Sequence, residues 1–282
     1  MSGPQSVDPG LLLFQLRRAQ SFWYQELYQA ESTPLPDPTS YAWQMCLEMR
    51  EWGDSLPPTL SPDIRRMFEE ELRYSYVYCI SPSSRAPQIT EYSRILIFEY
   101  AIAYLDEMHE ISHNAFDSAY YTYHDALKVY FMASQLLAVL RDAEDTVLSG
   151  ASIPVPISPP GCPPAPPIPK RVGQSGDNIA RALLTLERVP RTLAKYSERW
   201  DESTMLKISL EKMAAEVIER LKLRQQMPGL PMGQQQQQQQ QQLMYTNNVP
   251  GIAQGQNRTS PLRGEMRWVD VDPSQMMRGA GQ

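Results

Sequence analysis

The chain has 282 residues, of which 42% are hydrophobic and 21% are charged, and its net charge is −6. Residues 1–149 carry 21 acidic and 10 basic side chains, whereas residues 150–282 carry 11 and 16. An acidic first half argues against a DNA-binding surface, which needs clustered basic side chains to displace counterions from the phosphates. No stretch approaches the roughly 20 consecutive apolar residues that span a bilayer, so we expect no membrane contact.

The first half of the chain begins with three predicted amphipathic helices. Residues 11–30 carry apolar side chains at helical spacing, namely Leu12, Leu16, Ala19, Trp23, Leu27 and Ala30. A second helix is expected to begin at a Ser40 cap, to carry two tryptophans and to stop at a Pro-Pro pair. Ser61 followed by Pro62 predicts the N-cap and first residue of a third helix.

Two more helices complete residues 1–149. Thr90 is the expected cap of a fourth helix, and a fifth is expected to run from about Ser118 to Leu148. The apolar face of the fourth consists of Ile95, Leu96, Ile102, Leu105 and Met108. Because no segment alternates apolar and polar residues in the manner of a strand, the sequence predicts an all-α fold, with residues 1–149 as the first part of a helical domain.

Residues 150–176 form a proline-rich segment, with nine prolines between Pro154 and Pro169, and we expect an extended loop or linker there. Helical spacing resumes over residues 177–224, where Asp177 is the expected N-cap and Pro190 should kink or end the first of two helices. A helix pair this small does not bury its own apolar stripe, so we expect it to pack back on residues 1–149.

Residues 225–282 form a glutamine-rich tail. They hold 15 glutamines, including an unbroken run from Gln234 to Gln242, and few large aliphatic side chains. Such a composition does not offset the entropy lost on ordering, so we expect the tail to be disordered.

The sharpest enzymatic motif is His109-Glu110-Ile111-Ser112-His113, which matches the pattern in which two histidines one turn apart bind zinc and the glutamate acts as a general base. A catalytic zinc needs a third protein ligand, and the motif does not supply one. The alternative interpretation is a polar end of the fourth helix. The many tyrosines, such as Tyr74 and Tyr76, favour packing on half-buried helix faces over a ligand pocket.

Three stretches occur in the order and spacing of a known family. They are EMREWGDSLPPTLSP (48–62), RYSYVYCISPSSRAPQITEYSRILIFEYAIAYL (73–105) and LERVPRTLAKYSERWDES (186–203). Together they resemble the regulatory middle region of fungal zinc binuclear cluster transcription factors. The resemblance covers about residues 11–224.

This resemblance implies an all-α regulatory domain of a nuclear transcription regulator, in a family that tunes transcription and sometimes responds to metabolites. The family reads DNA through six closely spaced cysteines that hold two zinc ions, whereas this chain has only Cys46, Cys79 and Cys162. DNA contacts and zinc are therefore expected only in an absent N-terminal domain. The chain is accordingly expected to be the C-terminal part of a longer protein, an incomplete gene model, or a family member that has lost its DNA-binding domain.

We therefore expect a non-enzymatic effector region, located in the nucleus, that controls RNA polymerase II transcription through contacts with the transcription machinery. The sequence is compatible with a small-molecule effector and with a homodimer, but it assigns neither. No catalytic, cofactor-binding or metal-binding residue is assigned. The alternatives are a zinc metallopeptidase that uses His109, Glu110 and His113, and a helical scaffold outside transcription.

Overall fold

The computed structural model describes residues 8–28, 33–114, 122–150, 154–169 and 177–226. The regular elements in these ranges are all helices, so the predicted all-α fold is confirmed for the described part of the chain. The helices are α1 (Pro9–Tyr28), α2 (Pro38–Asp54), α3 (Pro62–Ile80), α4 (Glu91–His113), α5 (Tyr123–Asp142), α6 (Glu144–Leu148), α7 (Asn178–Ser197) and α8 (Glu202–Gln226).

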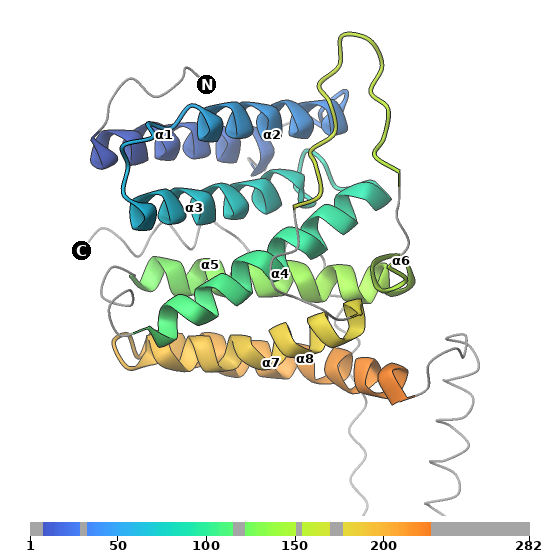
Figure 1. Ribbon diagram of the computed structural model, residues 1–282. Coiled ribbons are helices and arrows are strands. Elements are labelled where there is room, and N and C mark those ends of the chain that lie inside the picture. Colours follow the sequence, from blue (N-terminus) through green and yellow to red (C-terminus); the bar gives the residue numbers. More distant parts are fainter. Residues whose placement is uncertain (1–7, 29–32, 115–121, 151–153, 170–176, 227–282) are drawn as a thin grey trace, which may run out of the picture.

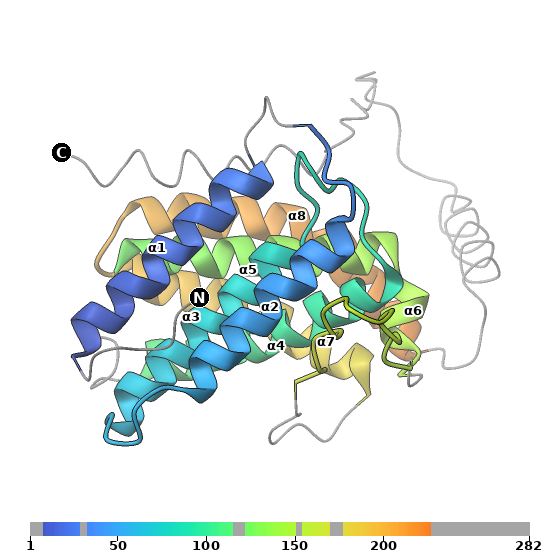
Figure 2. The same cartoon turned by 90° about the horizontal axis from the view of Figure 1, so that it is seen from above.

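The helices are stacked with α4 and α5 at the centre (Figure 1). On one side, α1 and α2 both contact α3, which in turn packs on α4. Seen from above, α1 and α2 cover the same side of the stack (Figure 2). On the opposite side, α7 packs on α4, α8 packs on α5, and α7 and α8 contact each other. The helices before and after the proline-rich segment therefore share one buried cluster, which includes Leu12 of α1 and Leu221 of α8.

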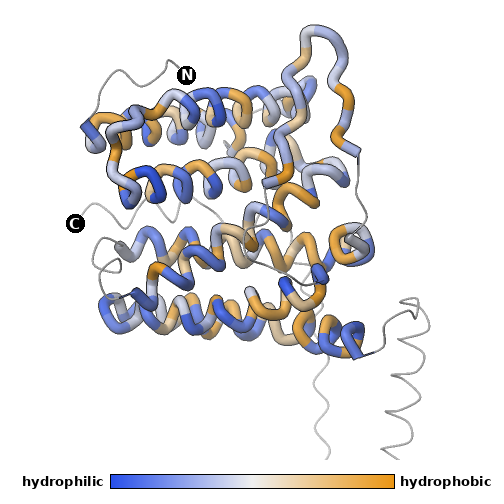
Figure 3. Tube along the Cα trace, viewed as in Figure 1, coloured by the Kyte–Doolittle hydropathy of each residue, from blue (hydrophilic) through white to orange (hydrophobic). Residues whose placement is uncertain are grey.

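The central position of α4 follows from its sequence. Apolar side chains occupy all of its faces rather than one stripe, and 15 of its 23 residues are buried. A helix that is apolar all round is buried in a core, whereas an amphipathic helix lies at the surface. Figure 3 shows hydrophobic residues along both α4 and α5, the helices at the centre of the stack.

The predicted N-caps are confirmed for three helices and wrong for α2. The side chains of Ser61, Thr90 and Asp177 accept backbone N–H groups at the starts of α3, α4 and α7. Helix α2 instead begins after Asp37, whose Oδ1 accepts the Ser40 N–H at 3.0 Å. Ser40 lies inside the helix because the Asp-Pro pair before it supplies both the cap and the first helical residue.

The expected fifth helix, 118–148, is not continuous in its described part. Ala143 leaves the helical region, with φ −144° and ψ 36°, and separates α5 from α6. Tertiary contacts stabilise the break, because the buried Glu144 pairs with Arg220 and Arg224 of α8. The start of the expected helix, 118–121, lies outside the described residues.

Of the two expected effects of Pro190, a kink or an end of the helix, the end is wrong, because α7 continues through this proline to Ser197. The missing Pro190 N–H removes one hydrogen bond of the helix. The side chains of Val189 and Leu193, on either side of the proline, are buried in the core, and this packing holds the helical conformation.

The described part of the proline-rich segment, residues 154–169, forms neither helix nor strand, as expected. Its second half lies against α4, where the Tyr92 hydroxyl donates to the Pro166 carbonyl at 2.7 Å and the Tyr100 hydroxyl donates to the Pro167 carbonyl at 3.1 Å. Helix α8 ends at Gln226, two residues inside the expected tail. The rest of that tail, 227–282, lies outside the described residues.

Candidate ligand-binding cavity

A cavity of about 390 Å³ lies among side chains of α1, α3, α4 and α5. Its apolar lining consists of Leu13, Ile64, Met67, Tyr104, Met108 and Ile111. Its polar lining includes Arg17 of α1, Glu70 and Glu71 of α3, and His124 and Asp125 of α5. A cavity of this size, mostly apolar with a few convergent polar groups, is typical of a small-molecule site.

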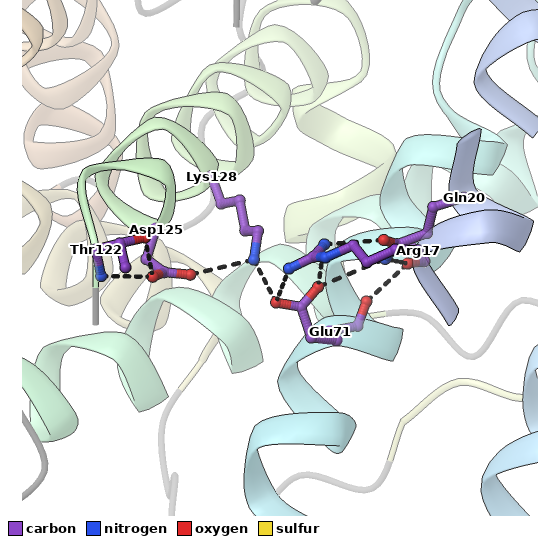
Figure 4. Close-up of polar contacts among 7 residues, drawn as sticks. Arg17, Gln20, Glu71, Thr122, Asp125 and Lys128 are labelled. Atoms are coloured by element: carbon purple, nitrogen blue, oxygen red, sulfur yellow. Dashed lines mark hydrogen bonds and ion pairs between the residues drawn. The ribbon is translucent and has the colours of Figure 1, made fainter. Parts of the chain in front are cut away.

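The polar side of the cavity is organised around Glu71 (Figure 4). Arg17 donates from Nη1 to Oε2 of Glu71 at 2.8 Å and from Nη2 to Oε1 at 3.0 Å. The ammonium group of Lys128, whose side chain is only 2% exposed, donates to Oε1 of the same carboxylate. Burial alone would raise the pKa of Glu71, but Lys128 and Arg17 outweigh it and lower the pKa to about 2. Glu71 is therefore a buried anion with two cationic partners.

Asp125 joins this ion-pair cluster to the start of α5. Its Oδ1 accepts a hydrogen bond from Lys128 at 3.1 Å. Its Oδ2 accepts the backbone N–H of Thr122 at 2.8 Å and the Thr122 hydroxyl at 3.0 Å. These bonds satisfy donors at the helix N-terminus and fix the ion pair that borders the cavity.

Glu70 differs from its neighbour because half of its carboxylate lacks a partner. The Oε1 atom pairs with Arg73, one turn further along α3. The Oε2 atom is buried and has no hydrogen-bond partner, and the whole residue is only 4% exposed. Burial raises the pKa of Glu70 to about 8, and Glu107 and Glu69 act in the same direction, against the effect of Arg73. This carboxyl group therefore keeps its proton well above the usual range.

The imidazole of His124 lies on the α5 side of the cavity. Burial, together with the cations of Lys128 and Arg17, lowers the pKa of His124 to about 4. The ring is therefore neutral near pH 7, with one nitrogen that donates and one that accepts a hydrogen bond. Perturbed titratable groups that line a cavity mark candidate functional sites.

The three motif residues expected to act on zinc, His109, Glu110 and His113, lie at the end of α4 and do not line this cavity. The Nδ1 atom of His109 is 3.1 Å from the Thr192 hydroxyl of α7, and Nδ1 of His113 is 2.8 Å from the His109 carbonyl oxygen. The two rings lie 4.2 Å apart. In the described part of the chain, no group of three or more His, Cys, Asp or Glu side chains is arranged to hold a metal ion.

The tyrosines that the sequence singled out on α3 pack against other rings. Tyr76 stacks on Tyr100 at 4.9 Å between ring centroids, and Tyr74 meets Phe131 edge-on at 5.5 Å. The tyrosine that lines the cavity is Tyr104, which helical spacing in the sequence did not identify. Two more of the chain's many tyrosines, Tyr120 and Tyr121, lie outside the described residues.

The site residues Glu70, Glu71 and Lys128 were missed from the sequence. The sequence holds no clear signal for them, because Glu69-Glu70-Glu71 stands between the core residues Phe68 and Leu72, and a helix packed on one side can expose all three acids. Helix α3 is instead packed on more than one side, by α1 and α2 and by α4. A carboxylate forced into a core needs a partner or a proton.

Comparisons with known proteins do not assign the chain to a class. No protein-family model, no curated protein and no solved structure matches it. None of the helices in the described part of the chain has the length and apolar character needed to cross a bilayer. The functional conclusion therefore depends on the residues and the geometry of the molecule itself.

Proposed function

We propose that the chain is a regulatory module of a nuclear transcription regulator and that its cavity takes a small-molecule effector. The observation that carries the effector role is the cavity of about 390 Å³ between four helices, whose lining is mostly apolar with a few convergent polar groups. A ligand that binds there contacts α1, α3, α4 and α5 together. Its binding energy would therefore stabilise one arrangement of these helices over others.

The transcriptional part of the proposal draws its support from the three stretches similar to fungal transcription factors. Their residues lie at helix junctions of the core. Trp52, in the first stretch, is buried at the end of α2 and meets Phe68 edge-on at 5.5 Å. Trp200, in the third stretch, lies between α7 and α8 with the Arg199 guanidinium 4.5 Å from its ring centroid.

A regulatory module acts through protein contacts, and α1 offers a surface for them. Leu11, Phe14 and Phe22 are each more than half exposed on this helix. Clustered exposed apolar side chains are typical of interaction surfaces. We propose that contacts with the transcription machinery, or with a second copy of the chain, use this helix.

A reporter experiment tests the transcriptional role. The full chain is fused to an unrelated DNA-binding domain, and reporter output is compared with that of the DNA-binding domain alone. We expect the fusion to change the output several-fold and an untethered tagged chain to accumulate in the nucleus. Unchanged output together with a uniform cellular distribution would favour a scaffold outside transcription.

The metallopeptidase alternative is tested separately by the zinc content of the purified chain. The described residues supply two imidazoles in His109 and His113 but no arranged third ligand. We expect less than stoichiometric zinc and no change with His109→Ala. One bound zinc per chain that is lost in this variant would reverse the ranking of the two functions.

A further inference from the structure

We propose that Ser158 is a phosphorylation site for a proline-directed protein kinase, and that its phosphate releases the tip of the proline-rich loop. This inference goes beyond the proposed function and does not depend on the cavity. It rests on three features of the loop: a serine followed by proline, an exposed extended backbone around it, and one hydrogen bond of the serine hydroxyl that a phosphate would break.

Ser158 lies in a loop that projects from the helix stack beside α6 (Figure 1). Residues 154–160 form neither helix nor strand. Ser158 is half-buried, but the preceding Ile157 is 97% exposed and the following Pro159 is exposed. A kinase binds the segment around the target hydroxyl in an extended form. A projecting loop without helical hydrogen bonds can adopt that form without unfolding the domain.

The prolines around Ser158 fit a proline-directed kinase. Pro159 follows the serine directly, and Pro156 lies two positions before it. Proline has no backbone N–H and a fixed φ, and these are the properties that such kinases select in the residue after the target. A residue before proline is also disfavoured in the helical region, so Ser158 is held in an extended conformation.

Three other pairs of serine or threonine with proline lie in the described part of the chain, and the fold holds each of them. Ser61 caps α3 with its side chain. Ser81 is only 3% exposed at the end of the same helix. The carbonyl oxygen of Thr33 accepts a hydrogen bond from Nε of Arg85 at 2.8 Å. Within the described residues, Ser158 is thus the one member of this group that neither lies at a helix end nor is hydrogen-bonded to a distant segment.

The hydroxyl of Ser158 closes the tip of the loop. It donates a hydrogen bond to the Pro163 carbonyl oxygen at 2.7 Å. Inside the turn that this bond encloses, the Cys162 N–H donates to the Pro159 carbonyl at 3.0 Å, and Gly161 has a φ of 83°. The Ser158 side chain therefore connects the residues before the turn to those after it.

The residues after the turn are anchored to α4. The hydroxyl of Tyr92 donates to the Pro166 carbonyl, and the hydroxyl of Tyr100 donates to the Pro167 carbonyl. The residues before the turn have no comparable anchor in the described part of the chain. The hydrogen bond of Ser158 thus holds the exposed side of the loop against its anchored side.

Phosphorylation would remove this hydrogen bond. Oγ of Ser158 attacks the γ-phosphorus of a nucleoside triphosphate and forms a P–O bond. The bond from that phosphorus to the β–γ bridging oxygen breaks, the nucleoside diphosphate leaves, and the hydroxyl proton passes to a base of the kinase. The phosphate carries a charge of about −1.5 to −2 and offers acceptor oxygens. These acceptors repel the Pro163 carbonyl oxygen, so the loop tip opens.

The test is incubation of the full chain with ATP and a purified mitogen-activated protein kinase, which is proline-directed. Mass spectrometry assigns each phosphate to its residue, because the tail holds a further pair, Ser260-Pro261. We expect phosphate on Ser158, and Pro159→Ala should slow its addition at least about tenfold, since the kinase loses its contact with the ring. No phosphate on Ser158, while the same kinase modifies a standard Ser-Pro peptide, would overturn the inference.

Cys162 reports whether the loop tip opens. Cys46 and Cys79 are buried, so a maleimide should react first with the half-buried Cys162 of the folded chain. Phosphorylation and Ser158→Ala should each speed this reaction about two- to tenfold, as expected for the loss of one hydrogen bond of ordinary net strength. Ser158→Thr keeps the hydroxyl and is the matched control. Thermal unfolding confirms that each variant folds, and unchanged thiol reactivity after phosphorylation would refute the opening.

Discussion

Two consecutive glutamates on α3 show how partners, rather than burial, set the charge of a core residue. Glu70 and Glu71 are both less than 10% exposed. Glu71 has Arg17 and Lys128 as partners and its pKa falls to about 2, whereas burial raises the pKa of Glu70 to about 8 against the weaker effect of Arg73 and Arg66. One residue is therefore a structural anion and its neighbour is a proton-holding group in a cavity.

Glu71→Gln should lower the free energy of unfolding by about 3 kcal/mol, because it leaves the buried ammonium of Lys128 without its closest anion. Urea unfolding at neutral pH measures this change. Glu69→Gln is the matched control and should stay within about 0.5 kcal/mol of the wild type, since this residue is exposed. Equal stabilities of the two variants would show that the Glu71 cluster contributes no net stability.

Glu70 should make the protein less stable as pH rises. The folded carboxyl, with a pKa of about 8, holds a proton that the unfolded chain releases near the ordinary value of 4.5. The contribution of Glu70 to the free energy of unfolding is therefore fully present below about pH 4.5. It falls between about pH 4.5 and about pH 8, by at most ~1.4 kcal/mol per pH unit.

Glu70→Gln should remove this part of the pH dependence. Urea unfolding of the wild type and the variant at about pH 5 and about pH 8 measures the two slopes. We expect the variant to gain stability relative to the wild type as pH rises. Parallel curves would mean that Glu70 ionises alike in the folded and unfolded chains.

At the scale of elements, a buried ion pair joins helices from the two sides of the proline-rich segment. Arg181 of α7 donates from Nη2 to Oε2 of Glu99 at 2.7 Å and from Nη1 to Oε1 at 3.0 Å. Both side chains are at most 5% exposed. This bidentate pair fixes the register of α7 on α4.

Arg181→Met should cost about 3–5 kcal/mol of stability, because it removes the bidentate guanidinium from the buried Glu99 carboxylate. The double variant Glu99→Met with Arg181→Met should recover most of this loss, since no buried charge is left unpaired. Arg188→Met is the control: its pair with Asp106 spans 3.4 Å and is partly exposed, so it should cost at most about 1 kcal/mol. Urea unfolding measures all three, and a double variant no more stable than Arg181→Met would contradict the expected recovery.

The helices were largely predictable because their signals are local. Apolar spacing and the caps Ser61, Thr90 and Asp177 lie within a few residues of the structure that they specify. The errors arose where distant residues decide the conformation. Ala143 breaks the expected fifth helix where Glu144 pairs with α8, and Pro190 stays in α7 because its neighbours are packed in the core.

The cavity was not predictable for the same reason. Its central pairs join residues more than 50 positions apart, such as Arg17 with Glu71 and Glu71 with Lys128. Spacing along one helix shows neither that these acids are buried nor which cation they contact. The His109 and His113 pattern, by contrast, was visible in the sequence and lies outside the cavity.

At the scale of the whole molecule, one core spans α1 to α8 and the cavity lies among four of these helices. A ligand in this cavity would contact α1, the helix that also carries the exposed apolar residues Leu11, Phe14 and Phe22. It would thereby affect how α1 packs on the other helices. The proposed ligand-controlled module requires such a connection between the cavity and the proposed contact surface on α1.

Reporter output of the fused chain with altered cavity residues tests this account most directly. Wild type, Glu70→Gln and Glu69→Gln are fused to the same DNA-binding domain and compared at equal protein amounts. The account predicts that wild type and Glu69→Gln change the output equally and that Glu70→Gln departs from both. Equal output from all three fusions would contradict the claim that the cavity controls a regulatory module.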